Sequence, residues 1–370
     1  MAVKLKQKKI CFFNSCSAWG GGEKWHFEAA EFLSQHQFEV SVAAAPGSPL
    51  YSKAKQAGIT TRSVKVGNLS ALNLFKILGL ANWMRREDFD VVILNLPSDL
   101  KCAGLAAKIA GVRRVIYRRG SAIPVKNTVL NRWLFGNLLD DVLANSEETK
   151  KTLLVNNPNL FPAEKIHVIY NGIDCNAGCQ EEMTPAVKFV DGSPFVIGTA
   201  GRMSRQKNQK FLVDLAVSLL QVGRDFKVRI AGDGPLRNEL ENYARQCGVL
   251  NYFEFLGFVK DVDRFMQGID LFVLPSHWEG FGYVLVEAMA ARKAVVAFDI
   301  SSNPEIISNG ETGFLAPFDD LNAFTEKTCL LMDEPELRMQ MGRNGYARVR
   351  CKFDKKNNLK MLAGILLEGM

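Results

Sequence analysis

Short apolar runs, each followed by a polar or glycine-containing turn and a helical stretch, recur along this 370-residue chain. This pattern constrains the fold strongly, because parallel strands buried on both faces appear as apolar runs and need helices to connect them. First-half strands are expected at residues 9–13, 39–43, 90–94, 115–117, 141–144 and 167–169, with helices such as 24–35 and 100–110 between them. Second-half strands are expected at residues 195–199, 227–230, 253–256, 271–274 and 294–297. The sequence therefore predicts two doubly wound α/β halves.

The length suits two domains that each bury a core. A composition of 47% hydrophobic and 23% charged residues is typical of a globular protein. We expect an N-terminal domain over residues 1–175 and a C-terminal domain over residues 194–352. The polar, irregular stretch 176–193 is the expected linker, and residues 353–370 are expected to form a C-terminal helix.

Two carboxylates, Glu279 and Glu287, lie eight residues apart across a glycine turn in E-G-F-G-Y-V-L-V-E. We expect Glu279 in a loop after a buried strand and Glu287 about one turn into a helix. The helix start between them offers unpaired N–H groups that suit a phosphate, and the carboxylates can bind hydroxyls. A sugar nucleotide has both kinds of group. The alternative is that both acids are solvated, as acids often are in doubly wound proteins.

A second segment, G-R-M-S-R-Q-K-N, follows the expected strand at residues 195–199. It places Arg202 and Lys207 at the carboxyl end of that strand, where α/β sheets bind ligands. A planar guanidinium and a compact ammonium together suit a diphosphate. The alternative is that both are ordinary solvated loop cations.

In this order and spacing, the two segments resemble the family 4 retaining glycosyltransferases. They match that family's G-R-x-x-x-x-K-N and E-x7-E signatures, the latter in its usual E-G-F-G and E-A-M-A context. Further similar segments are the following: A-G-D-G-P-L at residues 231–236, N-G-I-D at 171–174 and G-G-G-E at 20–23. The resemblance implies the GT-B fold, in which two Rossmann-like domains face each other across a cleft. In the family, a C-terminal helix often crosses back to the first domain.

The resemblance also implies roles for particular residues. A nucleotide-diphosphate sugar would place its diphosphate between Arg202, Lys207 and the helix start at Gly282 and Tyr283. Both cations would offset charge developing on the leaving diphosphate, which is electrostatic catalysis. The resemblance further implies transfer with retained configuration, by same-face attack without a covalent enzyme intermediate.

Four other positions complete the expected site. Glu287 would accept hydrogen bonds from the ribose hydroxyls, and Glu279 would contact the transferred sugar or stabilise its oxocarbenium-like transition state. Gly20 and Gly21 would let the first domain's backbone approach the donor or acceptor closely.

The sequence departs from the family in the first domain. Many members carry a histidine at the end of a strand there, whereas the corresponding segment here contains Arg118 and Arg119. Either arginine is a candidate for contact with a charged acceptor or the donor phosphate, and a plain surface arginine is the alternative. His277, two residues before Glu279, is expected to be structural.

We expect neither a cofactor nor a metal. The four histidines show no metal-ligand spacing, and no Asp-x-Asp stands at a strand end. The eight cysteines include no CxxC pair, which favours reduced thiols in a cytoplasmic protein. No secretion signal is expected, because the apolar run after the basic residues 1–9 is too short. No membrane span is expected either, because no stretch approaches the roughly 18 to 20 apolar residues that a span requires.

Positive charge is concentrated in the first half. Residues 1–175 contain 23 Lys and Arg against 14 Asp and Glu, and the remainder contains 23 against 25. This asymmetry suggests an anionic partner, either a membrane surface or an acidic glycan. Nucleic acid is not expected, because no RRM, KH or helix-turn-helix pattern accompanies the basic residues.

An apolar stretch at residues 72–84 precedes Arg85 and Arg86. Such a helix can lie on a bilayer surface, so the protein is expected in the cytoplasm with the inner face of the membrane as an optional partner. The alternative is a core helix whose cationic last turn complements the helix dipole. Both interpretations stay open at the level of sequence.

The expected function is therefore transfer of a sugar from a nucleotide-diphosphate donor to a glycan or glycolipid acceptor, in lipopolysaccharide or other cell-surface polysaccharide biosynthesis. Alternatives are a non-catalytic sugar-nucleotide-binding relative and a GT-B epimerase. A transferase needs an acceptor and an epimerase does not, so a requirement for an acceptor discriminates between them. An oxidoreductase is disfavoured, because the glycines at residues 20–22 lack G-x-G-x-x-G spacing and Glu39 begins the second strand.

Overall fold

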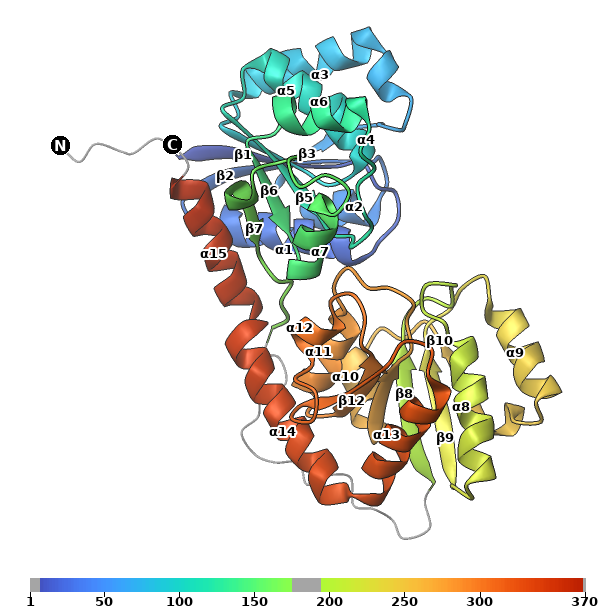
Figure 1. Ribbon diagram of the computed structural model, residues 1–370. Coiled ribbons are helices and arrows are strands. Elements are labelled where there is room, and N and C mark those ends of the chain that lie inside the picture. Colours follow the sequence, from blue (N-terminus) through green and yellow to red (C-terminus); the bar gives the residue numbers. More distant parts are fainter. Residues whose placement is uncertain (1–6, 175–193, 369–370) are drawn as a thin grey trace. The chain divides into compact units, whose positions relative to one another are not determined.

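The computed structural model describes residues 7–174 and 194–368 (Figure 1). The expected linker at residues 176–193, and Lys4 and Lys6 of the basic N-terminal stretch, lie outside the described residues. The described chain forms two compact units. Unit 1 contains the residues up to Tyr170 and those from Leu359 onward, and unit 2 contains Asn171–Asn358.

Unit 1 contains seven strands with helices between them. Their bounds are β1 Lys8–Asn14, α1 Gly21–Ser34, β2 Phe38–Ala44, α2 Pro49–Gln56, β3 Thr60–Ser63, α3 Leu74–Glu87, β4 Val91–Leu94, α4 Pro97–Asp99, α5 Leu105–Ala110, β5 Arg114–Arg119, α6 Val129–Leu138, β6 Asp141–Ala144, α7 Glu147–Leu154 and β7 Ile166–Val168.

Unit 2 contains six strands and its own set of helices. Their bounds are β8 Phe195–Ala200, α8 Lys210–Gln221, β9 Phe226–Ala231, α9 Arg237–Gln246, β10 Phe253–Gly257, α10 Val262–Gln267, β11 Leu271–Leu274, α11 Tyr283–Ala290, β12 Ala294–Phe298, α12 Asn303–Ile306, β13 Gly313–Ala316, α13 Leu321–Asp333 and α14 Pro335–Lys352, after which α15 spans Lys355–Glu368.

Both sheets are parallel and doubly wound, as the apolar runs predict. The order is β3-β2-β1-β4-β5-β6-β7 in unit 1 and β10-β9-β8-β11-β12-β13 in unit 2. Strand order therefore reverses between β1 and β4 in one sheet, and between β8 and β11 in the other. Doubly wound sheets bind ligands outside the carboxyl ends of the strands at such reversal points.

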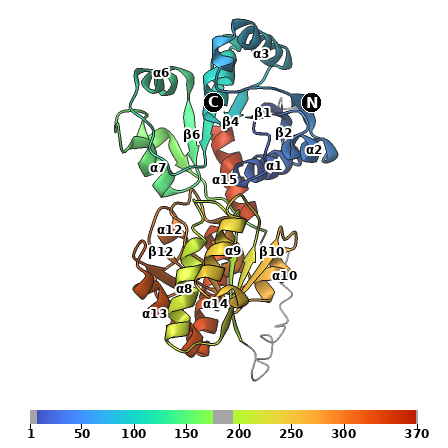
Figure 2. The same ribbon diagram turned by 90° about the vertical axis from the view of Figure 1, so that its right-hand side faces the viewer.

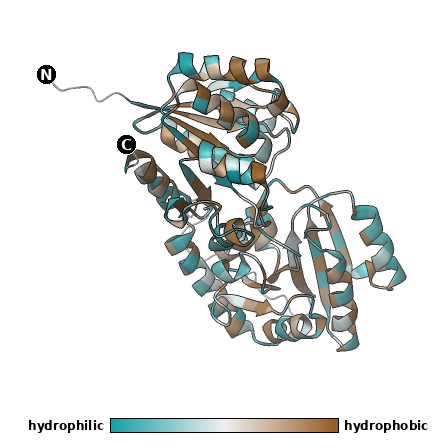
Figure 3. Ribbon diagram, turned by 45° about the horizontal axis from the view of Figure 1, so that its top comes forward, coloured by the Kyte–Doolittle hydropathy of each residue, from teal (hydrophilic) through white to brown (hydrophobic). Residues whose placement is uncertain are grey.

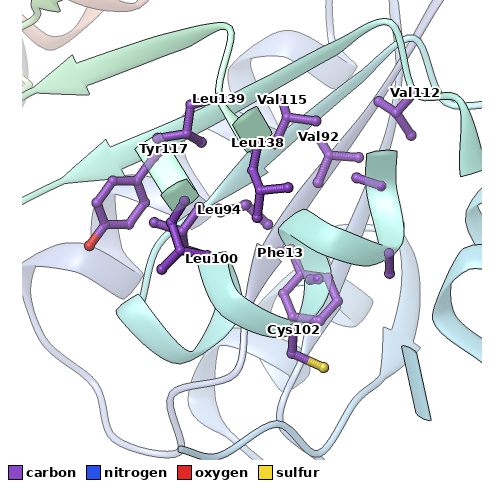
Figure 4. Packing of buried hydrophobic residues seen from close by; sticks show 14 of the residues in the cluster. Phe13, Val92, Leu94, Leu100, Cys102, Val112, Val115, Tyr117, Leu138 and Leu139 are labelled. Atoms are coloured by element: carbon purple, nitrogen blue, oxygen red, sulfur yellow. The ribbon is translucent and has the colours of Figure 1, made fainter. Parts of the chain in front are cut away.

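Helices cover both faces of the first sheet. Side chains of α3, α5 and α6 form one buried cluster with the strands, and side chains of α1 and α2 form another on the opposite face (Figure 1). Phe13 of β1, Leu94 of β4 and Leu138 of α6 lie in the first cluster (Figure 4). Burial of such side chains, at about 25 cal/mol per Å² of apolar surface removed from water, holds the layers together.

The second core is assembled in the same way. Helices α8 and α9 run side by side over the sheet (Figure 2), and three phenylalanines, Phe211, Phe298 and Phe324, meet edge to face at 4.9–5.4 Å between ring centroids. Helices in both units alternate apolar and polar residues along their length (Figure 3). That alternation is the amphipathic pattern of a helix with one buried face.

The last part of α15 packs in unit 1. Leu359, Leu362 and Leu366 are buried in the cluster on the α1 side of the first sheet. The ammonium of Lys8 and the guanidinium of Arg114 donate hydrogen bonds to backbone carbonyls in the same helix, the latter at 2.6 Å to Ile365. Residues far apart in the sequence thus share one core.

Candidate active site

The candidate donor site lies at the carboxyl ends of β8, β9 and β11 in unit 2. The loops there pack so closely that Gly232 and Gly234 have no room for a Cβ atom. Gly232 has φ +134°, and a Cβ built on it would lie 2.1 Å from the carbonyl oxygen of Gly201. A Cβ on Gly234 would lie 2.3 Å from the carbonyl oxygen of Met203. The glycines therefore let the A-G-D-G-P turn support the loop that carries Arg202.

Lys207 and Glu279, one from each signature, are in direct contact. Lys207 Nζ donates to Glu279 Oε1 at 2.6 Å, and the hydroxyl of Ser276 donates to the same oxygen at 2.7 Å. The Glu279 side chain is 5% exposed and that of Lys207 is 17% exposed. A charge-assisted bond in such a place is short and strong, and it fixes both charged groups.

Backbone contacts hold the two loops in register. The N–H of His277 donates to the carbonyl of Gln206 at 2.8 Å, and the Gln206 amide donates to the carbonyl of Trp278 at 2.9 Å. The His277 ring packs against Trp278 and Phe318, which is the structural environment expected for it. The ammonium of Lys207 therefore has a defined position, and only one of its three N–H groups is needed for Glu279.

The other donor-site candidates of unit 2 lie on the same edge of the sheet. Arg202 directly follows β8 in the chain, and its side chain is exposed. Gly282 is the N-cap of α11, Tyr283 is its first residue, and Glu287 lies half-buried in the second turn. Since β8 and β11 are neighbouring parallel strands, their carboxyl ends meet at this edge. The site combines cations, a helix N-terminus and a carboxylate, which suits a diphosphate attached to a hydroxylated group.

Unit 1 has a buried polar cluster at its own reversal point. Asn14 is the last residue of β1 and Asn95 directly follows β4, and their amides donate to Glu23 Oε1 at 3.1 and 3.3 Å. Glu23 is 7% exposed and lies in the first turn of α1. Gly20 is the N-cap of α1 and Gly21 its first residue, so the expected glycine turn leads directly into this cluster.

Arg118 contacts this cluster through Asn95. Its Nη1 donates to Asn95 Oδ1 at 3.4 Å, its guanidinium stacks 4.6 Å from the centre of the Trp25 ring, and the residue is 3% exposed. Arg119 is half-buried, and its Nη2 donates to the carbonyl of Ile123. These contacts position both side chains within unit 1, and their contact with an acceptor stays a prediction.

Three polar residues in or near this cluster were not predicted: the buried His26 and Asp99 and the half-buried Asn95. His26 is fully buried, and within the described chain neither ring nitrogen has a hydrogen-bond partner. Burial, aided by the charge of Arg118, holds the pKa of His26 well below its ordinary value. Asn95 directly follows β4 and Asp99 lies a few residues further on. A polar residue directly after a buried strand is the only feature of the sequence that could have indicated this part of the site.

Asp99 gives a pH-dependent prediction. It is fully buried and accepts hydrogen bonds from the Ser15 hydroxyl at 2.5 Å and the Leu96 N–H at 3.1 Å. Burial raises the pKa of its carboxyl from 3.8 to about 6, against the lowering effect of these bonds. The folded state thus binds this proton more tightly than the unfolded state, so the free energy of unfolding falls as pH rises from about 4 to about 6 and then levels off.

We expect Asp99→Asn to remove this dependence, because a carboxamide can accept the N–H bonds and donate to Ser15. The shift of about two units corresponds to roughly 3 kcal/mol across that window. Urea unfolding of both proteins between pH 4 and pH 8 measures the difference. Parallel stability curves for the two proteins would show that Asp99 does not titrate in this way.

Within residues 7–174 and 194–368, no group of three or more His, Cys, Asp or Glu is arranged to hold a metal ion. Among the helices of the described chain, none has the length and apolar character needed to cross a bilayer.

Two family models match the chain. The model of glycosyl transferases group 1 matches residues 180–348, and that of glycosyltransferase family 4 matches residues 19–177. The chain is a member of the family 4 glycosyltransferases, and its two parallel-sheet Rossmann-like domains confirm the expected GT-B class.

Individual relatives agree with this assignment. The mannosyltransferase LpsB of lipopolysaccharide core biosynthesis in Rhizobium meliloti (strain 1021) is 31% identical over 50% of this chain and 52% of its own, so the match spans about half of the relative. The UDP-Gal:alpha-D-GlcNAc-diphosphoundecaprenol alpha-1,3-galactosyltransferase of Escherichia coli is 24% identical over 90% of this chain and 89% of its own. The crystal structure of Anabaena HepE with UDP-glucose has a TM-score of 0.81 at 22% identity, covering 97% of this chain and 99% of HepE.

Proposed function

We propose that the protein transfers a sugar from a nucleotide-diphosphate donor to a glycan or glycolipid acceptor, with retention of configuration, in lipopolysaccharide or other cell-surface polysaccharide biosynthesis. The Lys207–Glu279 bond is the observation that carries this proposal, because it joins both family signatures at the reversal point of unit 2. Relatives that act on lipopolysaccharide core and on a diphosphoundecaprenol-linked sugar, and a structural neighbour that binds UDP-glucose, support it.

The chemistry follows from the charges at the site. As the bond between the sugar and the diphosphate breaks, negative charge grows on the leaving diphosphate. Lys207 and Arg202 offset that charge, and the N–H groups at the start of α11 add to the effect. Glu279 fixes the ammonium and contacts the sugar, while Glu287 accepts hydrogen bonds from the ribose hydroxyls. With two cations in these places, the reaction needs no metal.

A donor screen tests this function. The purified protein is incubated with UDP-, GDP-, ADP- and CMP-sugars in the presence of EDTA, and thermal stability and nucleotide release are measured. We expect one nucleotide sugar to stabilise the protein selectively. Arg202→Ala and Glu287→Ala should each lower its affinity by about 10- to 100-fold, since hydrogen bonds to charged groups contribute about 1.5–3 kcal/mol.

Exposed residues of the same type provide the controls. Arg245→Ala in α9 and Glu326→Ala in α13 remove the same charges elsewhere in unit 2 and should leave the affinity unchanged. Binding without nucleotide release in the presence of glycan acceptors would favour a non-catalytic relative, and an epimerised sugar formed without acceptor would favour an epimerase. The absence of binding by every nucleotide sugar would refute the donor-site assignment.

We also place the protein in the cytoplasm, in contact with the inner face of the cell membrane. The α3 region supports this placement. One side of it is a core helix and the other side is an exposed apolar surface, so each of the two interpretations of residues 72–84 describes part of it. Ile77, Leu80 and Trp83 face the core, whereas Leu74 and Phe75 are 62% and 89% exposed. An exposed apolar surface next to basic residues suits a bilayer with anionic lipids.

A further inference from the structure

Unit 1 also has a hollow of about 430 Å³ whose lining does not include Glu23. It lies where the carboxyl ends of β1, β2 and β3 meet, which is the ligand-binding edge of a doubly wound sheet. Its polar wall consists of Ser15, Ser17, Lys65, Ser70 and Lys76. Ser15 and Ser17 belong to the loop that continues into the glycine turn before α1, so the hollow adjoins the expected first-domain site in the chain.

Two lysines, Lys65 and Lys76, line the hollow. Lys76 Nζ donates to the carbonyl of Lys65 at 3.0 Å and to the hydroxyl of Ser70 at 3.1 Å, which fixes its position in the wall. Within the described chain, neither Lys65 nor Lys76 forms an ion pair with an acidic side chain. The Ser15 hydroxyl donates to Asp99 behind the wall, and two lysines beside the hydroxyls of Ser17 and Ser70 suit a phosphate or diphosphate group.

Five exposed apolar side chains lie within two positions in the chain of Ser70 or Lys76, which line the hollow. We call them the apolar rim: Leu69, Leu72, Leu74, Phe75 and Leu78. Their exposures are 77%, 83%, 62%, 89% and 46%, although the opposite side of α3 is buried in the core. Clusters of large exposed apolar side chains mark interaction sites in soluble proteins.

The cationic hollow and the apolar rim together indicate which class of ligand fits. A soluble sugar phosphate would fill the hollow and leave the rim in water, whereas a neutral lipid would cover the rim and leave the ammonium groups unneutralised. A hydrocarbon chain attached to a phosphate satisfies both. The excess of basic over acidic residues in residues 1–175, 23 against 14, favours the same anionic ligand.

We propose that this hollow and the apolar rim bind the phosphate and the adjoining hydrocarbon of a lipid-linked acceptor. The proposal rests on the glycosyltransferase function proposed above and defines the class of its acceptor. The lysines bind the phosphate that joins glycan to lipid. The rim enters the bilayer interface beside it.

Vesicle binding tests the proposal. Phosphatidylcholine vesicles are prepared alone, with undecaprenyl phosphate, or with phosphatidylglycerol at equal charge, and co-sedimentation of the full chain is measured. We expect preference for undecaprenyl phosphate. Lys65→Gln/Lys76→Gln should weaken that binding about 25-fold, since each lysine near an anionic surface contributes about fivefold. Leu72→Ser/Phe75→Ser should weaken binding to all vesicles.

Matched controls change the same groups elsewhere in unit 1. Lys55→Gln/Lys165→Gln removes two exposed lysines, and Val155→Ser removes an apolar side chain that is 57% exposed. All variants are first compared by thermal unfolding, so that loss of fold is recognised. Equal binding of both anionic vesicles by wild type and by the Lys65/Lys76 variant would overturn the phosphate site, leaving a general membrane surface.

Two further outcomes are informative. Stabilisation by inorganic diphosphate without vesicle binding would indicate a soluble phosphorylated ligand and overturn the lipid part of the proposal. The donor screen on the unaltered protein separates the two proposals. Nucleotide-sugar binding without vesicle preference refutes only the acceptor class, and vesicle preference without nucleotide-sugar binding refutes only the donor function.

Discussion

Glu279→Gln is expected to lower the rate of sugar transfer at saturating donor by about 10²- to 10³-fold, the loss typical of removing one electrostatic group from an active site. Glutamine has nearly the same shape and can still accept from Ser276, so the loop should stay in place. The substitution removes the negative charge that holds the Lys207 ammonium, whose Nζ lies 2.6 Å from Glu279 Oε1. The rate constant for transfer, together with the affinity for donor, measures the effect.

The opposite substitution should affect activity and stability together. Lys207→Met leaves Glu279 buried without its cation, which costs about 3–5 kcal/mol of unfolding free energy when one partner of a buried pair is removed. The double variant Lys207→Met/Glu279→Gln should recover part of that stability and none of the activity. Urea unfolding of the four proteins gives the coupling energy between the two side chains.

Lys352→Met provides a control, because Lys352 is an exposed lysine at the end of α14. It should match wild type in both rate and stability. Additive stability changes for Lys207 and Glu279 would mean that the pair does not interact in solution. A fully active Glu279→Gln protein would remove Glu279 from the mechanism.

Gly232→Ala is expected to lower the free energy of unfolding by about 3–5 kcal/mol. The strain of a non-glycine residue at φ +134° adds to a Cβ that would lie 2.1 Å from the carbonyl oxygen of Gly201. Relief of that overlap must move Gly201, and Arg202 follows it directly. We therefore expect weaker donor binding in the fraction that remains folded, measured by thermal shift with the donor identified in the screen.

Gly223→Ala is the matched control. Gly223 also has positive φ, at +72°, but a Cβ there meets nothing within 4 Å. The cost should be about 1 kcal/mol, from the left-handed backbone alone. Denaturant unfolding of both variants separates backbone strain from steric overlap. Equal stabilities would show that the loops after β8 and β9 are free to separate.

The central strands could be predicted from sequence because burial on both faces leaves an apolar run. Two edge strands could not. Thr60–Ser63 contains no apolar side chain, and Gly313–Ala316 is a run of only four residues that begins with glycine. Both become strands by pairing with β2 and β12. Their residues have no strand pattern of their own, because the neighbouring strand supplies the hydrogen bonds.

The same distinction applies to the site. The direct bond between Lys207 and Glu279 was not predicted, but the approach of the two loops that carry them was expected, since the carboxyl ends of neighbouring parallel strands meet at one edge. The cluster around Glu23 was not, because an acid in the first turn of a helix usually stays in solvent and interacts with the dipole. Nothing in the local sequence shows that Asn14 and Asn95, 81 positions apart, bind the same carboxylate. Convergence of this kind depends on strand order.

Packing of Leu359, Leu362 and Leu366 in unit 1 has a consequence for biosynthesis. These residues leave the ribosome only after all of unit 2 has been made, so unit 1 waits for its last helix while the remainder of the chain is translated. During that interval, the apolar surface that these leucines cover in the finished protein is open to chaperones and proteases. A chain that terminates within unit 2 would therefore lack the three leucines that complete the core of unit 1.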